Sequence, residues 1–225
     1  EVKTMNLKEA MAARHSVRQY KNKPLTPEII AALQAEVEAC NRDGELHIQL
    51  VTNEPKAFDS FMAHYGKFSG VSNYFALAGP KGPELDEKCG YYGERLVLKA
   101  QQLGLNTCWV AMTYSKGKAV FSTAPGEKLC IVIALGYGEN QGIAHKSKPF
   151  EKIASAEGQI PSWFRSGAEA ALLAPTAMNQ QKFKFELHGS QVTAKAGLGF
   201  YSKIDLGIAK YHFEIGAGKE NFTWA

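Results

Sequence analysis

The feature that most constrains the fold is an unbroken apolar run at residues 129–135, Leu-Cys-Ile-Val-Ile-Ala-Leu. A strand with one wet face alternates apolar and polar side chains, so a run without polar residues predicts a strand covered on both faces. Gly136-Tyr137-Gly138 follows directly and ends the strand. The rest of the chain must therefore supply elements that cover this strand from both sides.

Other segments predict a mixture of helices and strands. Apolar residues at helical spacing predict helices over residues 6–14, 26–40, 84–103, 162–173 and 203–215. Short apolar runs predict strands over residues 46–51, 74–78, 107–111, 183–187 and 191–196, the last two as a hairpin. Three helices are expected to begin at a capping side chain, namely Asn6, Thr26 and Ser202. This mixture has no internal repeat and predicts an α+β fold, an α/β sandwich.

The composition is that of an ordinary globular protein. The 225 residues are 45% apolar and 21% charged, which is enough for a core without a metal or disulfide. The net charge of +4 is too mild to predict a nucleic-acid partner, and no Lys/Arg run exceeds two residues. Such a charge would suit an anionic cofactor or substrate, and solubility explains it equally well.

The cysteines indicate neither a metal site nor a disulfide framework. Cys40, Cys89, Cys108 and Cys130 form no C-x-x-C pair, so zinc-type spacing is absent and no metal is expected. They predict reduced, mostly buried thiols and a cytoplasmic location. Residues 1–20 carry charges throughout and show no secretory leader. No stretch reaches the length of a membrane span, so no membrane partner is expected.

Residues 139–161 are polar and rich in Lys, Gly and Pro, which makes them the best candidate linker. They predict an N-terminal lobe over residues 1–145 and a C-terminal lobe over residues 146–225.

Arg14, Ser16 and Arg18 alternate along a segment, residues 14–23, that is expected to be extended. Alternation places their side chains on one side of the chain. Two guanidinium groups with a hydroxyl between them suit phosphate oxygens. Taken alone, the segment is explained more simply as a solvated basic strand. His15 is expected on the opposite side, as a structural or backbone-anchoring residue.

A second segment, residues 174–181, has the sequence Ala-Pro-Thr-Ala-Met-Asn-Gln-Gln and lies between a helix and a strand. Its small residues let a planar ligand approach the backbone, and its amide and hydroxyl groups can both donate and accept, as the edges of a flavin require. An ordinary capped loop is the simpler alternative. The turn at 104–112 and the basic stretch at 145–149 also have plain structural explanations when taken singly.

Taken together and in this order, the segments resemble the nitroreductase family. Arg-His-Ser-Val-Arg at 14–18, after a short helix, is similar to the family's opening. Gln-Gln-Leu-Gly-Leu-Asn-Thr-Cys-Trp at 101–109 resembles its central helix and following strand. Leu-Gly-Tyr-Gly at 135–138, followed by a Lys-x-Lys pair, resembles its closing strand and basic tail. The loop at 174–181 resembles the signature Ala-Pro-Ser-x-x-Asn-x-Gln.

The chain departs from the usual pattern in where that signature lies. Typical members carry it after the second helix, where this chain has Cys-Asn-Arg-Asp-Gly at 40–44. The chain is therefore similar to a subgroup of NADPH nitroreductases with two half-related lobes in one polypeptide, a pseudo-two-fold arrangement. Ordinary members take the arginine motif and the signature loop from different subunits. The resemblance implies either a monomer whose lobes mimic that dimer or a homodimer that exchanges its C-terminal lobe.

The resemblance also implies a cofactor, FMN, and a set of residues around it. The arginine motif and the two lysines would hold the phosphate, Arg18 would lie near the pyrimidine end of the ring, and the backbone at 111–112 would face N5. The 175–181 loop would pack on the ring. The implied cofactor-binding residues are Arg14, His15, Ser16, Arg18, Trp109, Val110, Ala111, Met112, Lys146, Lys148, Pro175, Thr176, Asn179 and Gln181.

The function implied is an FMN-dependent oxidoreductase that takes hydride from NAD(P)H and reduces a nitroaromatic, a quinone or a similar small acceptor. No catalytic side chain is expected, because the flavin carries the hydride. No G-x-G-x-x-G follows a strand, so a Rossmann site for NAD(P)H is not expected. The alternatives are another flavin reaction on the same scaffold, such as dehydrogenation or flavin cleavage, and an FMN-binding or sensing protein with little turnover.

Overall fold

The computed structural model describes residues 5–225, so the first four residues of the segment inspected for a leader lie outside it. The fold contains two four-stranded sheets. The first has the order β1-β2-β4-β3 and is antiparallel throughout. Its strands are β1 (Gln49–Val51), β2 (Asn73–Pro80), β4 (Glu127–Gly136) and β3 (Asn106–Val110).

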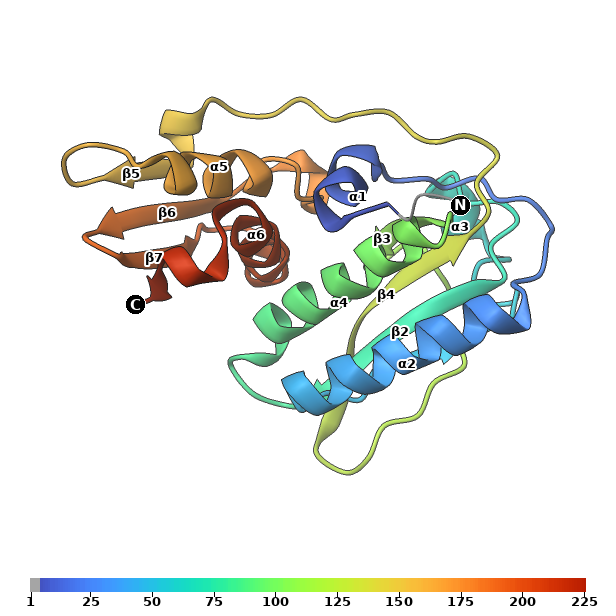
Figure 1. The fold of residues 1–225 in the computed structure, drawn as a ribbon. Coiled ribbons are helices and arrows are strands. Elements are labelled where there is room, and N and C mark those ends of the chain that lie inside the picture. Colours follow the sequence, from blue (N-terminus) through green and yellow to red (C-terminus); the bar gives the residue numbers. More distant parts are fainter. Residues whose placement is uncertain (1–4) are drawn as a thin grey trace.

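Strand β4 lies inside this sheet and is covered on both faces, as the apolar run predicts. Ile133 pairs with Phe75 of β2 on one side and with Trp109 of β3 on the other. Ile131, Ile133 and Leu135 belong to the main core, whereas Val132 and Ala134 belong to a second core on the opposite face. Helices α2 (Pro27–Gly44) and α4 (Leu85–Gln102) cover the main-core face (Figure 1).

The second sheet has the order β5-β6-β7-β8 and lies in the C-terminal half. The predicted hairpin is confirmed, because β6 and β7 pair antiparallel with His188 opposite Gln191. Two helices pack on this sheet, and the Phe185 ring stacks on Phe213 with centroids 4.6 Å apart. The elements are β5 (Ala154–Ala156), β6 (Phe183–His188), β7 (Gln191–Ala196), β8 (Thr223–Trp224), α5 (Ser162–Ala171) and α6 (Ser202–Ala217).

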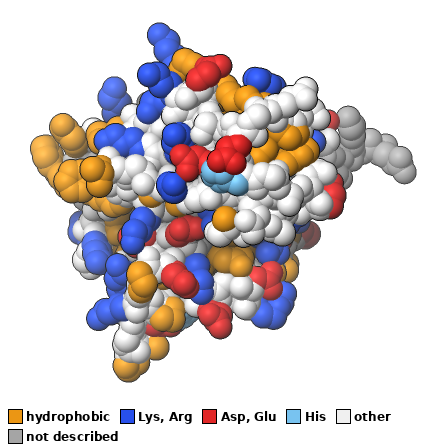
Figure 2. Space-filling model, turned by 90° about the vertical axis from the view of Figure 1, so that its left-hand side faces the viewer, with side chains coloured by type: hydrophobic (Ala, Val, Ile, Leu, Met, Phe, Trp, Pro, Cys, Tyr) orange, Lys and Arg blue, Asp and Glu red, His pale blue; other side chains and the backbone are white. Residues whose placement is uncertain are grey.

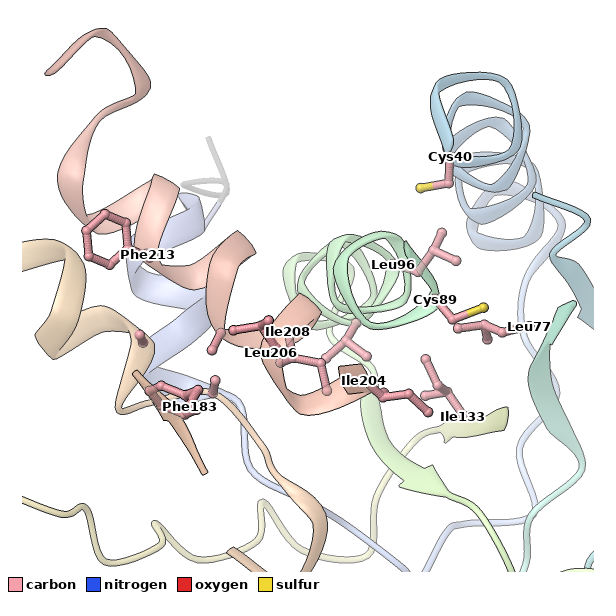
Figure 3. Packing of buried hydrophobic residues seen from close by; sticks show 14 of the residues in the cluster. Cys40, Leu77, Cys89, Leu96, Ile133, Phe183, Ile204, Leu206, Ile208 and Phe213 are labelled. Atoms are coloured by element: carbon pink, nitrogen blue, oxygen red, sulfur yellow. The ribbon is translucent and has the colours of Figure 1, made fainter. Parts of the chain in front are cut away.

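Helices α4 and α6 join the two halves through a close contact. A Cβ added at Gly90 would lie 2.0 Å from the carbonyl oxygen of Ile204, and one added at Gly207 would lie 2.0 Å from that of Glu87. Glycine at both positions lets the helix backbones touch. Ile204 of α6 points toward Ile133 of β4 (Figure 3), and one hydrophobic core runs through both halves.

The predicted linker is shorter in the structure than in the sequence analysis. Residues 139–149 contain no helix or strand and run along the upper edge of the molecule from the first sheet to the second (Figure 1). A 3-10 turn, Phe150–Lys152, and strand β5 then follow within the expected linker. The prediction was wrong for residues 150–156. Strand β5 forms because it pairs with β6, and its three residues carry no local sequence pattern that predicts this pairing.

Other differences lie at the ends of elements. The caps of α1 (Leu7–Ala13) and α2 are confirmed, since Asn6 and Thr26 accept hydrogen bonds from Glu9 N and Ile29 N. Helix α2 extends to Gly44, and the short helix α3 (Phe61–Tyr65) was not predicted. Ser202 was expected to cap α6, but it is the first residue of that helix. Tyr201, with φ 61°, occupies the cap position. Two further 3-10 turns are Ala177–Asn179 and Lys219–Asn221.

Candidate functional site

Two adjoining cavities lie where the arginine segment, strand β3 and the 174–181 loop meet. The first has a volume of about 570 Å³ and is lined mostly by polar and charged residues, and the second has a volume of about 640 Å³ and a mostly apolar lining. The cavities are contiguous, because both are lined by Ser16, Arg18, Pro175, Thr176 and Met178. A ligand with one anionic end and one flat apolar end matches this arrangement.

Arg14 is the most buried cation at the first cavity. It follows α1 directly, and its side chain is 4% exposed. Its Nη2 donates a long bond of 3.5 Å to the Leu173 carbonyl, while its Nε has no hydrogen-bond partner. Burial lowers the pKa of Arg14, and the nearby Glu94 carboxylate opposes that shift. A buried guanidinium that lines a polar cavity is suited to binding an anion.

The extended segment places its alternate side chains as predicted. Val17 is buried and its N–H donates to the Thr107 carbonyl at 3.0 Å, which fixes the segment against β3. Ser16 and Arg18 line both cavities. His15 also lines the first cavity, as the resemblance implies, although alternation alone places it on the opposite side. Strict alternation fails there because the segment forms only an isolated bridge and not a regular strand.

The 174–181 loop is held in an unusual backbone conformation. Met178, Asn179 and Gln181 have φ values of 50°, 53° and 44°, a region that residues other than glycine seldom adopt. Thr176 Oγ1 accepts from Gln181 N at 3.0 Å. Pro175, Thr176 and Asn179 line the first cavity. Strained backbone of this kind persists where surrounding contacts determine it, and such positions cluster at ligand sites.

Gln181 supplies several of those contacts from beneath the loop. Its side chain is buried, accepts from Lys148 N at 2.8 Å and donates to the Lys146 carbonyl at 2.9 Å. Lys148 Nζ donates to the carbonyls of Gln180 and Gln181 at 2.7 and 3.2 Å. Gln181, Lys146 and Lys148 therefore brace the loop and do not line either cavity.

The second cavity brings β3 and α6 together. Trp109, Ala111 and Met112 line it, as expected of the backbone that follows β3, whereas Val110 points into the core. Of the fourteen residues implied by the resemblance, the structure thus places ten at the cavities and four outside them: Val110, Lys146, Lys148 and Gln181.

Several lining residues were missed by the sequence analysis. Phe200, Tyr201, Ile204, Asp205 and Ile208 contribute to the second cavity from the start of α6. Their spacing resembles that of any buried helix face, so the sequence holds no signal that separates them from the core. In the first cavity, Lys67 and His145 were also missed. Only His145 had a signal, because it precedes the expected Lys-x-Lys pair.

Asp205 ties the loop to α6. Its carboxylate accepts from Ala177 N at 3.0 Å and from Gln180 Nε2 at 2.6 Å. The residue is 2% exposed, and burial raises the pKa of its carboxyl group to about 6. Asp205 therefore anchors one end of the 174–181 loop while lining the apolar cavity.

The thiols are not arranged for metal binding or nucleophilic chemistry. Cys40, Cys89 and Cys108 are buried and Cys130 is half-buried, which confirms the prediction of mostly buried thiols. Burial raises the pKa of Cys108, the thiol at the second cavity. Within residues 5–225, no cluster of three metal-ligating side chains occurs. Over the same residues, every helix is too short or too polar to cross a membrane.

The surface of the C-terminal half carries both signs of charge. On the face shown in Figure 2, basic and acidic side chains are interspersed, without a continuous basic stripe. One such mixture is formed by Lys184 and Lys195, which both pair with Glu186. This pattern is that of an ordinary solvated face.

Solved structures share this fold. A putative nitroreductase from Thermotoga maritima is 22% identical, with 96% of this chain and 85% of that chain covered at a TM-score of 0.64. A nitroreductase-like protein from Streptococcus mutans is 13% identical, with coverage of 65% and 95% and a TM-score of 0.54. A putative nitroreductase from Desulfovibrio desulfuricans, solved in complex with FMN, is 15% identical, with coverage of 69% and 96% and a TM-score of 0.52. The fold is therefore that of the nitroreductases, as predicted.

The family follows from the sequence itself. A family model described as "Putative TM nitroreductase" matches residues 6–217, and the chain belongs to this family. Nitroreductases are oxidoreductases, so the predicted family and the general class of chemistry are confirmed. No curated protein matches the chain significantly.

Proposed function

We propose that the protein binds one FMN per chain across the two adjoining cavities and acts as a two-electron oxidoreductase. The observation that carries the proposal is Arg14, a buried cation that lines a polar cavity opening into an apolar one. FMN combines a phosphate with a flat ring and so matches both parts. The FMN-bound structure from Desulfovibrio desulfuricans, which has the same fold, supports this choice.

Each part of the site would contact a different part of FMN. Arg14 and Ser16 would donate hydrogen bonds to the phosphate. Arg18, which lines both cavities, would lie near the pyrimidine end of the ring, where a cation stabilises negative charge. Pro175 and Thr176 would contact the ring from the C-terminal half. Lys146 and Lys148 would act from behind the loop, where their present contacts lie.

When bound, FMN supplies the hydride-transfer chemistry, so the protein's task is binding, orientation and exclusion of water. Met112, Phe200, Tyr201 and Ile204 would cover a flat acceptor in the second cavity, and their apolar surfaces suit a nitroaromatic or a quinone. NAD(P)H would occupy the same place before the acceptor does. The buried thiols favour a cytoplasmic setting for this chemistry.

The site would be completed within one chain. Residues of the arginine segment and of the 174–181 loop line the same cavity although about 160 positions separate them, with Arg14 and Leu173 in contact 159 positions apart. This proximity supports a monomer whose lobes mimic the usual dimer over a homodimer that exchanges its C-terminal lobe.

The proposal is tested by the cofactor and its reduction. We expect the purified protein to be yellow and to release FMN, identified by mass spectrometry. Stopped-flow mixing with NADPH or NADH should bleach the flavin absorbance within a turnover. The alternative, an FMN-binding protein with little turnover, predicts a flavin that stays oxidised. Release of FAD, or no flavin uptake from added FMN, would contradict the proposal.

A further inference from the structure

Behind Arg14 lies a buried polar cluster that the proposed reaction does not use directly. Glu94 on α4 and His212 on α6 are both 0% exposed. His212 Nε2 lies 2.8 Å from Glu94 Oε1, and His212 Nδ1 lies 3.1 Å from the carbonyl oxygen of Ala170. The second carboxylate oxygen, Glu94 Oε2, accepts from Trp109 Nε1 at 3.0 Å. The cluster therefore connects α4, α5, α6 and β3.

The geometry places a proton on the His212–Glu94 pair. The Ala170 carbonyl can only accept, so Nδ1 must carry a hydrogen. A short contact between Nε2 and Glu94 Oε1 requires a second hydrogen, either on the imidazole or on the carboxyl group. In both cases the pair has no net charge. Together with Arg14, the three groups then carry a net charge of +1.

Arg14 and His212 compete for the same carboxylate oxygen. Arg14 Nε lies 3.8 Å from Glu94 Oε1, too far for a hydrogen bond, whereas His212 holds the short contact. Both Glu94 oxygens are engaged by His212 and Trp109, and Arg14 Nε has no hydrogen-bond partner. A buried carboxylate released from His212 would attract the guanidinium strongly, because charges interact strongly where water is excluded.

We propose that His212 is a positioning residue for the anion site: by engaging Glu94, it keeps the 3.8 Å contact between Arg14 and Glu94 from tightening into a hydrogen-bonded ion pair, so that the guanidinium stays available to a phosphate. This inference rests on the proposed function, because the phosphate is that of FMN. It gives α6 a role at the anion site in addition to its contribution to the apolar cavity. Nearby Cys108 adds no charge to the cluster, because burial raises the pKa of its thiol.

A purely structural role for the cluster makes a different prediction. If His212 and Glu94 only hold α4 and α6 together, replacing them should weaken the binding of FMN and riboflavin equally. Riboflavin separates the two accounts, because it has the ring of FMN and lacks the phosphate. The ratio of the two dissociation constants reports on the phosphate site alone.

The experiment measures binding of FMN and riboflavin to the full-length apoprotein by flavin fluorescence quenching. His212→Leu should weaken FMN binding by about tenfold, the effect of losing one charge-assisted hydrogen bond. It should weaken riboflavin binding by less than about twofold. The double variant Glu94→Gln/His212→Leu should restore FMN affinity, because the competing carboxylate is gone. Glu127→Gln is the matched control, since Glu127 pairs with His47 at 2.7 Å and lines neither cavity. This control variant should change the affinity for neither FMN nor riboflavin.

If His212→Leu loses affinity for FMN and riboflavin equally, or loses affinity for neither, the inference is overturned. If His212→Leu does not fold, FMN binding by the single variant Glu94→Gln tests the inference. We expect it to bind FMN at least as tightly as the wild type, and a selective loss of FMN would overturn the inference. A wild-type protein that binds no FMN would instead refute the proposed function, so the two failures are distinguishable.

Discussion

At the residue scale, the candidate site contains two buried ionisable groups, Arg14 and Asp205. Arg14 offers a positive charge to the polar cavity, and Asp205 places a carboxyl group in the apolar one. Burial acts on both by disfavouring the charged form, and it lowers the pKa of Arg14 and raises that of Asp205. Both residues carry an energetic cost in the free protein that a bound ligand or an anchored loop would offset.

Replacing Arg14 tests the anion site directly. Arg14→Ala should weaken FMN binding by about 1.5–3 kcal/mol, because it removes charge-assisted hydrogen bonds. Arg42→Ala is the matched control, since the Arg42 side chain is 73% exposed and lines neither cavity. It should change the free energy of FMN binding by less than about 0.5 kcal/mol. Flavin titration of both variants provides the comparison. Equal affinities would remove Arg14 from the phosphate site.

Replacing Asp205 tests the pH dependence of stability. Its folded-state pKa of about 6 exceeds the ordinary value of 3.8, so the folded protein binds more protons and loses stability as the pH rises between these values. Asp205→Asn removes this loss. Relative to the wild type, the variant should therefore gain about 2 kcal/mol in unfolding free energy from pH 4 to pH 7.5. Changed hydrogen bonds add a difference that does not depend on pH.

Urea denaturation at the two pH values measures that gain, with the exposed Asp59→Asn as control. A difference between Asp205→Asn and the wild type that does not change with pH would show that burial does not shift this carboxyl group.

At the element scale, the contact between α4 and α6 determines how the two sheets meet. The contact depends on glycine, because a side chain at Gly207 would collide with the backbone of α4. It also brings Ile204, Asp205 and Ile208 to the second cavity and His212 to Glu94. A shift of α6 should therefore disturb the core and the site together.

Gly207→Ala should destabilise the protein by about 1–3 kcal/mol, although alanine is the better helix former, because its Cβ would lie 2.0 Å from the Glu87 carbonyl oxygen. Gly82→Ala is the control, since nothing lies within 4 Å of an added Cβ there, and it should change stability by less than about 0.5 kcal/mol. Thermal or chemical unfolding measures both. An undiminished stability in Gly207→Ala would show that the helices can separate at little cost.

The sequence predicts those elements whose patterns are local. The apolar run at 129–135, the caps at Asn6 and Thr26 and the hairpin each depend on neighbouring residues, and the structure confirms them. Strands β5 and β8 have three and two residues and form only because a partner strand is near, so no local pattern marks them.

The candidate site divides in the same way. The arginine segment and the 174–181 loop have recognisable sequences, and the structure brings them to one cavity. Lys148 looks like a phosphate ligand in the sequence, yet its Nζ donates to loop carbonyls. Glu94 and His212 are separated by more than 100 positions and meet only through packing of α4 on α6, so the sequence gives no sign of the pair.

At the scale of the whole molecule, one chain brings together two segments that typical family members take from two subunits. One hydrophobic core runs through both halves, and α6 contributes to the core as well as to the site. The C-terminal half therefore contributes to the hydrophobic core and to the cavity walls. This arrangement predicts a site that does not depend on association with a second copy.

The most direct test of the central claim is the stoichiometry of FMN in a protein of known mass in solution. The apoprotein is titrated with FMN while flavin fluorescence is recorded, and light scattering gives the mass of the same sample. The account predicts a monomer near the chain mass of 24.6 kDa that binds one FMN. A protein that binds FMN only as a dimer, or that binds one FMN per two chains, would contradict it.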